Sequence, residues 1–439
     1  MKNLFKQPAS CSLLLPAAIL LLFCTAVFSQ QPVPAKPQAK NILIMNATAH
    51  LGNGHTIENS VIGFENGKLI LVGDATMVRI DKSKYEVVIN GYGKHVYPGI
   101  IAANTILGLS EIELVRSTLD FTETGTINPD VRALIAYNTD SKVIPTVRSN
   151  GVLLAQIVPQ GGMISGTSSV VTLDAWNWED AAYFPDEGVH LNWPSLIIYR
   201  RQGAEADDNQ KELIEKNISR LRDFFTEAKA YAAAPAPAEN LRFEAMKGLF
   251  AGTKKLYLHA GYAKEIISAV NFAKEFGVQA VIVGGRDSWM LTDFLKENKV
   301  PVILGRTHAL PGREDEDTDL PYKLPFLLRQ AGVPFCVSVD GYWQVRNLAF
   351  NAGTAAGYGL SKEEALMSVT LDAAKILGID KTAGSLEEGK EATLILSSGD
   401  ILNMESCNIE YAFINGRQID LGSIQAELYR KYKERYGLK

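Results

Sequence analysis

Cysteine is scarce in this chain of 439 residues, which contains only four. Cys11 and Cys24 fall in an N-terminal segment that we expect to be removed, so Cys336 and Cys407 remain in the mature chain. A disulfide framework is therefore excluded, although one disulfide between these two residues stays open. The roughly 410 residues that remain are enough for a large α/β barrel with a smaller companion domain.

A large excess of charge of either sign is also missing. The 44 lysines and arginines nearly balance the 49 aspartates and glutamates, the net charge is −5, and the two signs are interspersed. Because no basic stripe is visible, we expect no nucleic-acid partner and no membrane contact of the mature form. The expected partners are a small-molecule ligand or another protein subunit.

Long apolar runs are missing except near the N-terminus, where residues 13–28 carry no charge. Lys2 and Lys6 precede this run, and Ser29 follows it. That layout predicts a secretory signal peptide over residues 1–29. A membrane anchor is the alternative, but the run contains a proline and is short for crossing a bilayer. We therefore expect an exported protein, periplasmic or secreted.

Strand patterns occur at both ends of the remaining chain, after a Pro/Ala/Lys linker at residues 30–40. The turn pairs Asn66-Gly67 and Asn415-Gly416 favour tight hairpins between such strands. We expect these strands at residues 41–45, 60–64, 69–72, 411–414 and 418–420. The economical inference is one discontinuous β-sandwich domain formed by residues 41–96 and 386–420, followed by a C-terminal helix at 421–439.

The middle of the chain alternates buried-strand runs with helical patterns, which predicts βα units and a parallel sheet. We assign residues 97–385 to this (β/α)8 barrel. Its longest helix starts at Asp207 or Asp208 and ends before Pro235. Strands are expected at residues 99–103, 152–158, 255–259, 280–283, 302–304 and 335–340.

Three segments carry a resemblance to a known family. They are GKHVYPGIIAANTILGL at residues 93–109, GLSKEEALMSVTLDAAKILG at 359–378 and GSLEEGKEA at 384–392. In order and spacing they resemble the amidohydrolase superfamily, particularly its imidazolonepropionase-like branch. The resemblance implies a distorted (β/α)8 barrel with a β-sandwich built from both termini, and a metal-dependent site at the carboxyl ends of the strands.

Several metal ligands that the resemblance implies are missing. Active members end the first barrel strand in His-x-His, because alternate residues at a strand end can aim two imidazoles at one metal ion. The aligned positions here are Asn104 and Ile106, and Gly284 stands where the sixth strand should end in a histidine. The bridging lysine of binuclear members has no candidate, since no lysine occurs between Lys142 and Lys211.

Other implied ligands are present. His259 ends the fifth strand, and Asp340 follows the eighth strand, where active relatives use an aspartate to bind metal and to accept a proton from the attacking water. By position, His190 replaces the fourth strand's lysine as a third ligand. The resemblance therefore implies one zinc or other divalent ion held by His190, His259 and Asp340, or no metal at all.

Three further residues are expected to line a pocket at the barrel mouth. Arg286 and His308 follow the sixth and seventh strands, although a hydrogen-bonding role is the alternative for His308. Gly162 belongs to the glycine-rich loop at residues 159–166, which lacks the spacing of a nucleotide-binding loop. The acidic run at residues 314–319 lacks the glycine and glutamate of a calcium loop, so we expect a solvated loop or a lid.

Three functions remain open, one of which, metal-free acid–base chemistry by His259 and Asp340, is permitted by the sequence but not suggested by it. The first is an exported, non-catalytic homologue that binds a small ligand or an amidohydrolase-like subunit, or that self-associates. The second is a mononuclear hydrolase of carbon–nitrogen bonds in cyclic amides, in which metal activates water and Asp340 accepts the proton. We favour the first, because losing the His-x-His pair removes support for the metal, and function resides in the site rather than in the fold.

Overall fold

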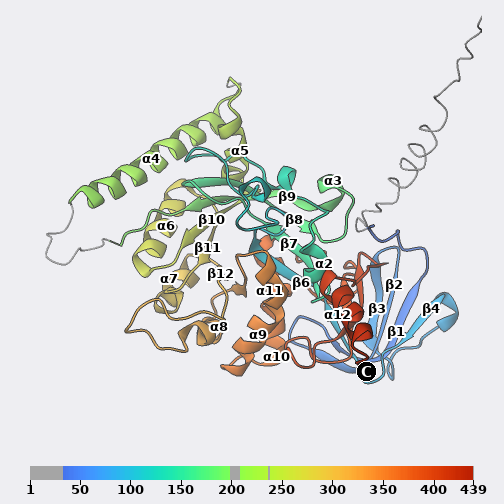
Figure 1. The fold of residues 1–439 in the computed structure, drawn as a ribbon. Helices are drawn as coiled ribbons and strands as arrows, with labels where there is room; N and C mark the ends of the chain where they lie inside the picture. Colours follow the sequence, from blue (N-terminus) through green and yellow to red (C-terminus); the bar gives the residue numbers. More distant parts are fainter. Residues whose placement is uncertain (1–32, 198–207, 236–237, 439) are drawn as a thin grey trace, which may run out of the picture. The chain divides into compact units, whose positions relative to one another are not determined.

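A computed structural model describes residues 33–197, 208–235 and 238–438 (Figure 1). Pro34–Lys439 form one compact unit. The predicted signal peptide and the first residues of the predicted linker lie outside the described residues. Among the described helices, none is both long enough and apolar enough to cross a membrane.

The first of two sheets contains strands from both ends of the chain. Its order is β16-β15-β14-β5-β1-β2-β3, with β4 paired to β1, and β14 joins the two ends by pairing antiparallel with β5. Both predicted Asn-Gly turns are confirmed, with φ of 49° and 79° at Asn66 and Gly67 and of 50° and 72° at Asn415 and Gly416. The strands are β1 (Ile42–His50), β2 (Thr56–Glu65), β3 (Lys68–Asp74), β4 (Val87–Asn90), β5 (His95–Pro98), β14 (Leu394–Ser397), β15 (Ile409–Ile414) and β16 (Arg417–Gln418).

The second sheet is the barrel predicted for the middle of the chain. Its strands are β6 (Ile100–Thr105), β7 (Val152–Ile157), β8 (Ile164–Thr172), β9 (Ala182–Asn192), β10 (Lys255–Ala260), β11 (Ala280–Gly284), β12 (Val302–Leu304) and β13 (Phe335–Val337). They follow one another in chain order around the sheet. Between β6 and β13 the chain inserts Ser368 and Val369, whose carbonyls accept hydrogen bonds from Val337 N–H and Ile101 N–H. The sheet is thus nearly closed.

One strand departs from a regular (β/α)8 barrel. β8 runs antiparallel to both β7 and β9, whereas the other neighbouring strands are parallel. The connection from β7 to β8 is the glycine-rich loop, which is too short for the helical crossover that a parallel strand would need. The predicted barrel class is confirmed, with a strand meander in this quarter.

The helices cover the outer side of the barrel. Figure 1 shows α6, α7 and α8 beside β10–β12, and α6 and α8 contact β10 and β13 respectively. The predicted longest helix is α4, which ends before Pro235; of its two predicted first residues, Asp207 lies outside the described residues. The bounds are α2 (Ile144–Arg148), α3 (Trp178–Ala181), α4 (Asp208–Ala233), α5 (Leu241–Phe250), α6 (Ala263–Phe276), α7 (Thr292–Glu297), α8 (Leu320–Ala331), α9 (Leu348–Gly357), α10 (Lys362–Met367), α11 (Leu371–Leu377) and α12 (Ile424–Arg435), with 3-10 turns η1 (Lys82–Lys84), η2 (Arg116–Thr118), η3 (Ala133–Ala136), η4 (Ser288–Leu291) and η5 (Trp343–Asn347).

Alternate residues of the barrel strands enter two different buried clusters. Those of the outer face pack with the helices in the larger cluster. Those of the inner face pack with α11, which supplies Ala373, Ile376 and Leu377. Inner-face members from the strands include Ile101, Leu154, Val170, Tyr257, Val281, Ile303 and Cys336. The barrel is therefore a packed core, and Cys336 is a buried free thiol not bonded to Cys407.

A buried ion network ties the start of the described chain to its end. Asp174 is 4% exposed, and its carboxylate accepts hydrogen bonds from Arg148 Nη1 at 2.7 Å and Arg417 Nη1 at 3.1 Å. The same carboxylate accepts from the Ala35 N–H at 2.9 Å, while Arg417 Nη1 donates to the Ala35 carbonyl at 3.0 Å. Part of the predicted linker is thereby fastened to the barrel and to the last hairpin.

We predict that Asp174→Asn lowers the free energy of unfolding by about 3 kcal/mol, because it leaves the Arg148 charge buried without its counter-ion. Denaturation in urea measures the change. The matched control is Asp293→Asn, since Asp293 is 88% exposed and lies 3.4 Å from Lys296 Nζ in a surface pair. Equal stability of the two variants would contradict the assigned role of Asp174.

Candidate functional site at the barrel mouth

Two of the predicted ligand histidines contact each other inside the barrel. His190 lies on β9 in register with Tyr257 of β10, and His259 lies two residues further along β10. His190 Nδ1 is 2.9 Å from His259 Nε2, which is hydrogen-bond distance. The His190 ring also stacks on Tyr257, with centroids 4.6 Å apart and planes at 8°. One face of His190 and one of its nitrogens are thus already engaged.

Burial keeps this histidine pair neutral. It lowers the pKa of His259 to about 4, and burial together with the neighbouring His259 lowers the pKa of His190 well below its usual range. Two neutral imidazoles share one proton in their mutual hydrogen bond, so one ring donates and the other accepts. His190 Nε2 has no hydrogen-bond partner among the described residues and is buried.

A second set of polar side chains fills the barrel beside the histidines. The Glu187 carboxylate, on β9, is buried and accepts hydrogen bonds from Tyr257 OH and Gln156 Nε2, each at 2.7 Å, and from Ser168 Oγ. Burial raises the pKa of Glu187, and these three donors oppose the rise. The side-chain oxygen Oε1 of Gln156 in turn accepts a hydrogen bond from the Asn104 N–H at 3.0 Å. Sequence analysis missed this network.

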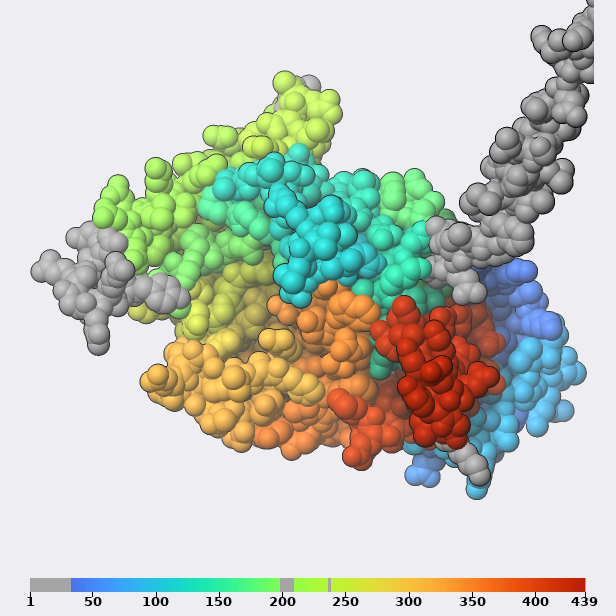
Figure 2. All heavy atoms as spheres, in the orientation of Figure 1, coloured from blue at the N-terminus to red at the C-terminus, as the bar shows by residue number. Residues whose placement is uncertain are grey.

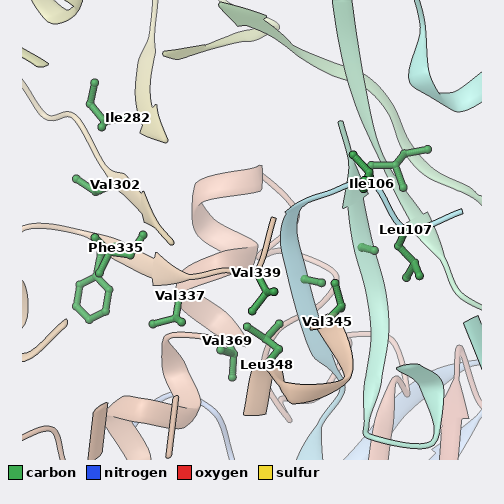
Figure 3. Packing of buried hydrophobic residues seen from close by; sticks show 14 of the residues in the cluster. Ile106, Leu107, Ile282, Val302, Phe335, Val337, Val339, Val345, Leu348 and Val369 are labelled. Carbon is green, nitrogen blue, oxygen red and sulfur yellow. The ribbon is translucent and has the colours of Figure 1, made fainter. Parts of the chain in front are cut away.

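Asn104 and Ile106 show what replaced the implied His-x-His pair. Asn104 lies where the β6–β7 register shifts and has a φ of 52°, a conformation in which asparagine is enriched. Ile106 is 8% exposed and belongs to the large hydrophobic cluster, as Figure 3 shows. The end of β6 is fixed instead by Thr105, whose Oγ1 donates to the Gly341 carbonyl at 2.5 Å.

Asp340 does not join the two histidines. Its side chain is exposed and has no hydrogen-bond or ion-pair partner within the described chain, although the adjacent Gly341 contacts β6. No three His, Cys, Asp or Glu side chains of the described residues are grouped so that they could hold a metal ion. The residues present therefore do not fit the three-ligand zinc site that the sequence predicted, since only His190 and His259 come together.

A cavity of about 290 Å³ lies at the carboxyl ends of three barrel strands, and neither His190 nor His259 lines it. Gly261, Gly284 and Gly305, which lie at the ends of β10, β11 and β12, all line it. A Cβ atom at Gly261 or Gly305 would have no neighbour within 4 Å, so the absence of side chains there keeps the space open. Other lining residues include Leu304, Leu310, Leu320, Leu324, Pro321, Arg286, Arg306 and Glu316.

The acidic segment predicted as a solvated loop or lid borders this cavity. Arg313 donates to both oxygens of the buried Asp287, at 3.0 and 3.1 Å. Glu316 accepts from the Gly312 N–H at 2.5 Å and lies 3.9 Å from Arg286 Nη1. A Cβ on Gly312 would lie 1.4 Å from Arg286 Nη1, so the guanidinium packs directly against this glycine. The segment is therefore docked on the barrel by specific contacts.

The other predicted pocket residues have different places. Arg286 lines the cavity. His308 instead borders a separate groove over α9, and its Nε2 lies 2.6 Å from Thr354 Oγ1, which fits the alternative hydrogen-bonding role. Gly162 has a φ of 62°, and its carbonyl accepts from Asn192 Nδ2 at 2.9 Å. That contact fixes the glycine-rich loop to the end of β9.

Comparison with known proteins agrees with this architecture. The sequence profile of the amidohydrolase family matches residues 322–419. The imidazolonepropionase of Shewanella frigidimarina is 22% identical over 377 residues, which cover 77% of this chain and 86% of that enzyme. The imidazolonepropionase of Shewanella putrefaciens is 29% identical over 201 residues, 42% of this chain and 43% of that enzyme.

Among solved structures, an amidohydrolase from Thermotoga maritima superposes with a TM-score of 0.74 at 24% sequence identity. The superposition covers 86% of this chain and 99% of that structure. At this identity the likeness shows the fold, and it extends over both sheets of the compact unit.

We predict that the histidine pair makes folding sensitive to mild acid. The ordinary pKa of histidine is 6.5, so between pH 6.5 and about 4 the unfolded chain binds a proton at position 259 that the folded chain does not. Stability is therefore lost as pH falls through this window. Between pH 7 and 5, wild type should lose roughly 2 kcal/mol more unfolding free energy than His259→Gln.

Urea denaturation at each pH measures this difference. The control is His55→Gln, because His55 is an exposed histidine in the loop before β2. It should follow the wild-type pH dependence. Parallel pH profiles for wild type and His259→Gln would contradict the prediction. They would mean that His259 has the same pKa in the folded and in the unfolded chain.

Proposed function

This chain belongs to the amidohydrolase superfamily, in its imidazolonepropionase-like branch, and we propose that it is a non-catalytic member that binds a small organic anion at the barrel mouth. One observation carries the proposal: His190 Nδ1 and His259 Nε2 are hydrogen-bonded to each other at 2.9 Å, so these two nitrogens are already engaged. Two nitrogens on one tetrahedral zinc ion would lie roughly 3.4 Å apart.

The charges around the cavity favour an anionic ligand. Arg286 and Arg306 line it together with a single carboxylate, that of Glu316. Glu316 already forms an ion pair with Arg313 Nη2 at 3.0 Å, whereas Arg306 has no ion-pair partner among the described residues. Arginine pairs well with planar carboxylates through its forked donors. The two lining arginines thus leave a surplus of positive charge for a ligand.

The lining and the volume of the cavity indicate the polarity and the size of the rest of the ligand. Leucines and prolines from β12, from α8 and from the loop that contains Leu310 form the apolar part of its lining. A volume of about 290 Å³ lies at the lower end for small-molecule sites. The proposed ligand is therefore a small acid with a compact apolar body. Arg286, packed on Gly312, would couple its binding to the acidic segment.

We also propose that the chain is exported, because residues 1–29 have the layout of a signal peptide. Partners other than the ligand, a homologous subunit or a second copy, remain proposals that rest on the resemblance alone. The hydrolase alternative rests on the retention of His259 and Asp340, and metal binding distinguishes it from the favoured function.

We predict that protein purified from the exported fraction of a bacterial host, after supplementation with zinc and manganese, holds well below one metal ion per chain. His259→Ala and Asp340→Ala should leave that content unchanged, because the two side chains do not share a site. Elemental mass spectrometry measures the metal, and the intact mass of the same sample should place the N-terminus near Gln30. About one ion per chain, lost in both variants, would instead establish the hydrolase.

We predict that small carboxylic acids such as hexanoate and 3-phenylpropionate raise the thermal unfolding midpoint, whereas their primary amides do not. Arg306→Met should weaken binding by roughly tenfold or more, because a charge-assisted hydrogen bond is lost. Titration calorimetry measures the affinity. Arg79→Met removes an exposed arginine of the first sheet's loops and serves as the control. Acids and amides that bind alike would contradict an anion site.

A further inference from the structure

The C-terminal helix α12 is almost unsupported by the rest of the chain. None of its residues is buried. Ser423 caps it by accepting a hydrogen bond from the Ala426 N–H, and Gln425 Oε1 accepts from Thr146 Oγ1 of α2 at 2.7 Å. Isolated helices of this length are marginal in water, and most helices in proteins are stabilised by burying one face. A partner that buries one face of α12 would supply the stabilisation that the rest of the chain does not.

Large apolar side chains form a stripe along this helix. Four of them recur at intervals of four residues, which places them on one face, and Tyr429 lies beside them. Figure 2 shows the helix, in red, on the outer surface of the molecule. The exposed fractions are 50% for Ile424, 45% for Leu428, 64% for Tyr429, 48% for Tyr432 and 67% for Tyr436. Within the described chain, nothing buries this stripe.

The same helix is basic, in contrast to the chain as a whole. It carries Arg430, Lys431, Lys433 and Arg435 against two glutamates, whereas the full chain has a net charge of −5. Cations lie over the tyrosine rings: Lys431 Nζ is 5.9 Å from the centre of the Tyr432 ring, and the Arg435 guanidinium is 6.0 Å from that of Tyr436. The apolar stripe is thus edged by positive charge.

We propose that α12 is a docking helix for an anionic lipid surface. An apolar face bordered by lysine and arginine is the pattern of helices that lie in a membrane interface, and tyrosine suits that boundary because its ring is apolar and its hydroxyl polar. The site lies apart from the barrel mouth and does not depend on the ligand proposed there.

Other occupants fit less well. Two copies that paired through this stripe would bring Lys431 and Arg435 of one copy near those of the other, and like charges at close range repel. A protein partner usually needs about 800 Å² on each side, which a single stripe of five side chains does not reach. A lipid surface needs only a shallow apolar face and negative charge. From the interspersed charges of the whole sequence we expected no membrane contact of the mature form. That expectation did not consider the cations of α12, because the net charge of a chain does not reveal a local cluster of one sign.

The test uses the mature chain, with its N-terminus verified by mass, and sedimentation with vesicles at low salt. Vesicles of phosphatidylcholine with about one third phosphatidylglycerol should bind it, and pure phosphatidylcholine should not. The double variant K431Q/R435Q should bind roughly 25-fold more weakly, at roughly fivefold per cation. A second variant, Leu428→Ser with Tyr432→Ser, should also weaken binding. Neither should alter the circular dichroism greatly, because no side chain of α12 is buried.

The matched control is K216Q/R220Q, which removes two exposed cations from α4, a helix without this apolar stripe, and it should bind like wild type. Wild type that ignores anionic vesicles, or a K431Q/R435Q variant that binds them fully, would overturn the proposal. Dimerisation that the Leu428→Ser variant with Tyr432→Ser abolishes would overturn it in favour of a second copy. Binding to soluble polyglutamate but not to vesicles would overturn it in favour of an acidic protein.

Discussion

The hydrogen bond between His190 and His259 governs the chemistry of this barrel's interior. It joins β9 to β10 at 2.9 Å, inside a layer where Glu187, Tyr257, Ser168 and Gln156 already satisfy one another. An unpaired polar group in such surroundings would cost free energy, so each side chain is placed by its partner. The two imidazoles are neutral because burial opposes their charge. The mutual hydrogen bond engages His190 Nδ1 and His259 Nε2, whereas His190 Nε2 has no hydrogen-bond partner among the described residues.

The positions that lack the family's ligand histidines also have unusual backbone conformations. Gly284, where the family's sixth strand should end in a histidine, has a φ of 97°, a conformation that side chains other than glycine rarely adopt. Asn104 has a φ of 52°. A histidine restored at Gly284 would therefore be strained. Gly284 instead lines the cavity together with Arg286 and Arg306.

Much of the fold could be read from the sequence, because strand ends and turns have local signals. Both Asn-Gly hairpins, the barrel strands near residues 152–158, 255–259 and 302–304, and the long helix α4 follow from periodicity and turn chemistry. The antiparallel β8 was not predicted, since the residue pattern of a buried strand does not indicate its direction in the sheet. The domain boundaries proposed from the sequence, at residues 96–97 and 385–386, remain predictions.

The site was less predictable, because contacts between distant residues decide it. Position in a strand identified His190 and His259 and placed both inside the barrel, but it could not show that they bond to each other. Gln156 and Glu187 lie in strands otherwise rich in apolar residues, and such buried polar residues are the signal that could have revealed the network. The contact of Arg286 with Gly312 depends on how the loop packs against the barrel, and the sequence contains no local pattern that predicts such packing.

The most direct test of the central claim is a crystal structure of the protein grown with excess zinc, with anomalous scattering measured at the zinc edge. We predict no anomalous peak within coordination distance of His190 or His259, and a hydrogen bond between His190 Nδ1 and His259 Nε2. A peak about 2 Å from both imidazoles and from a carboxylate of Asp340 would contradict it.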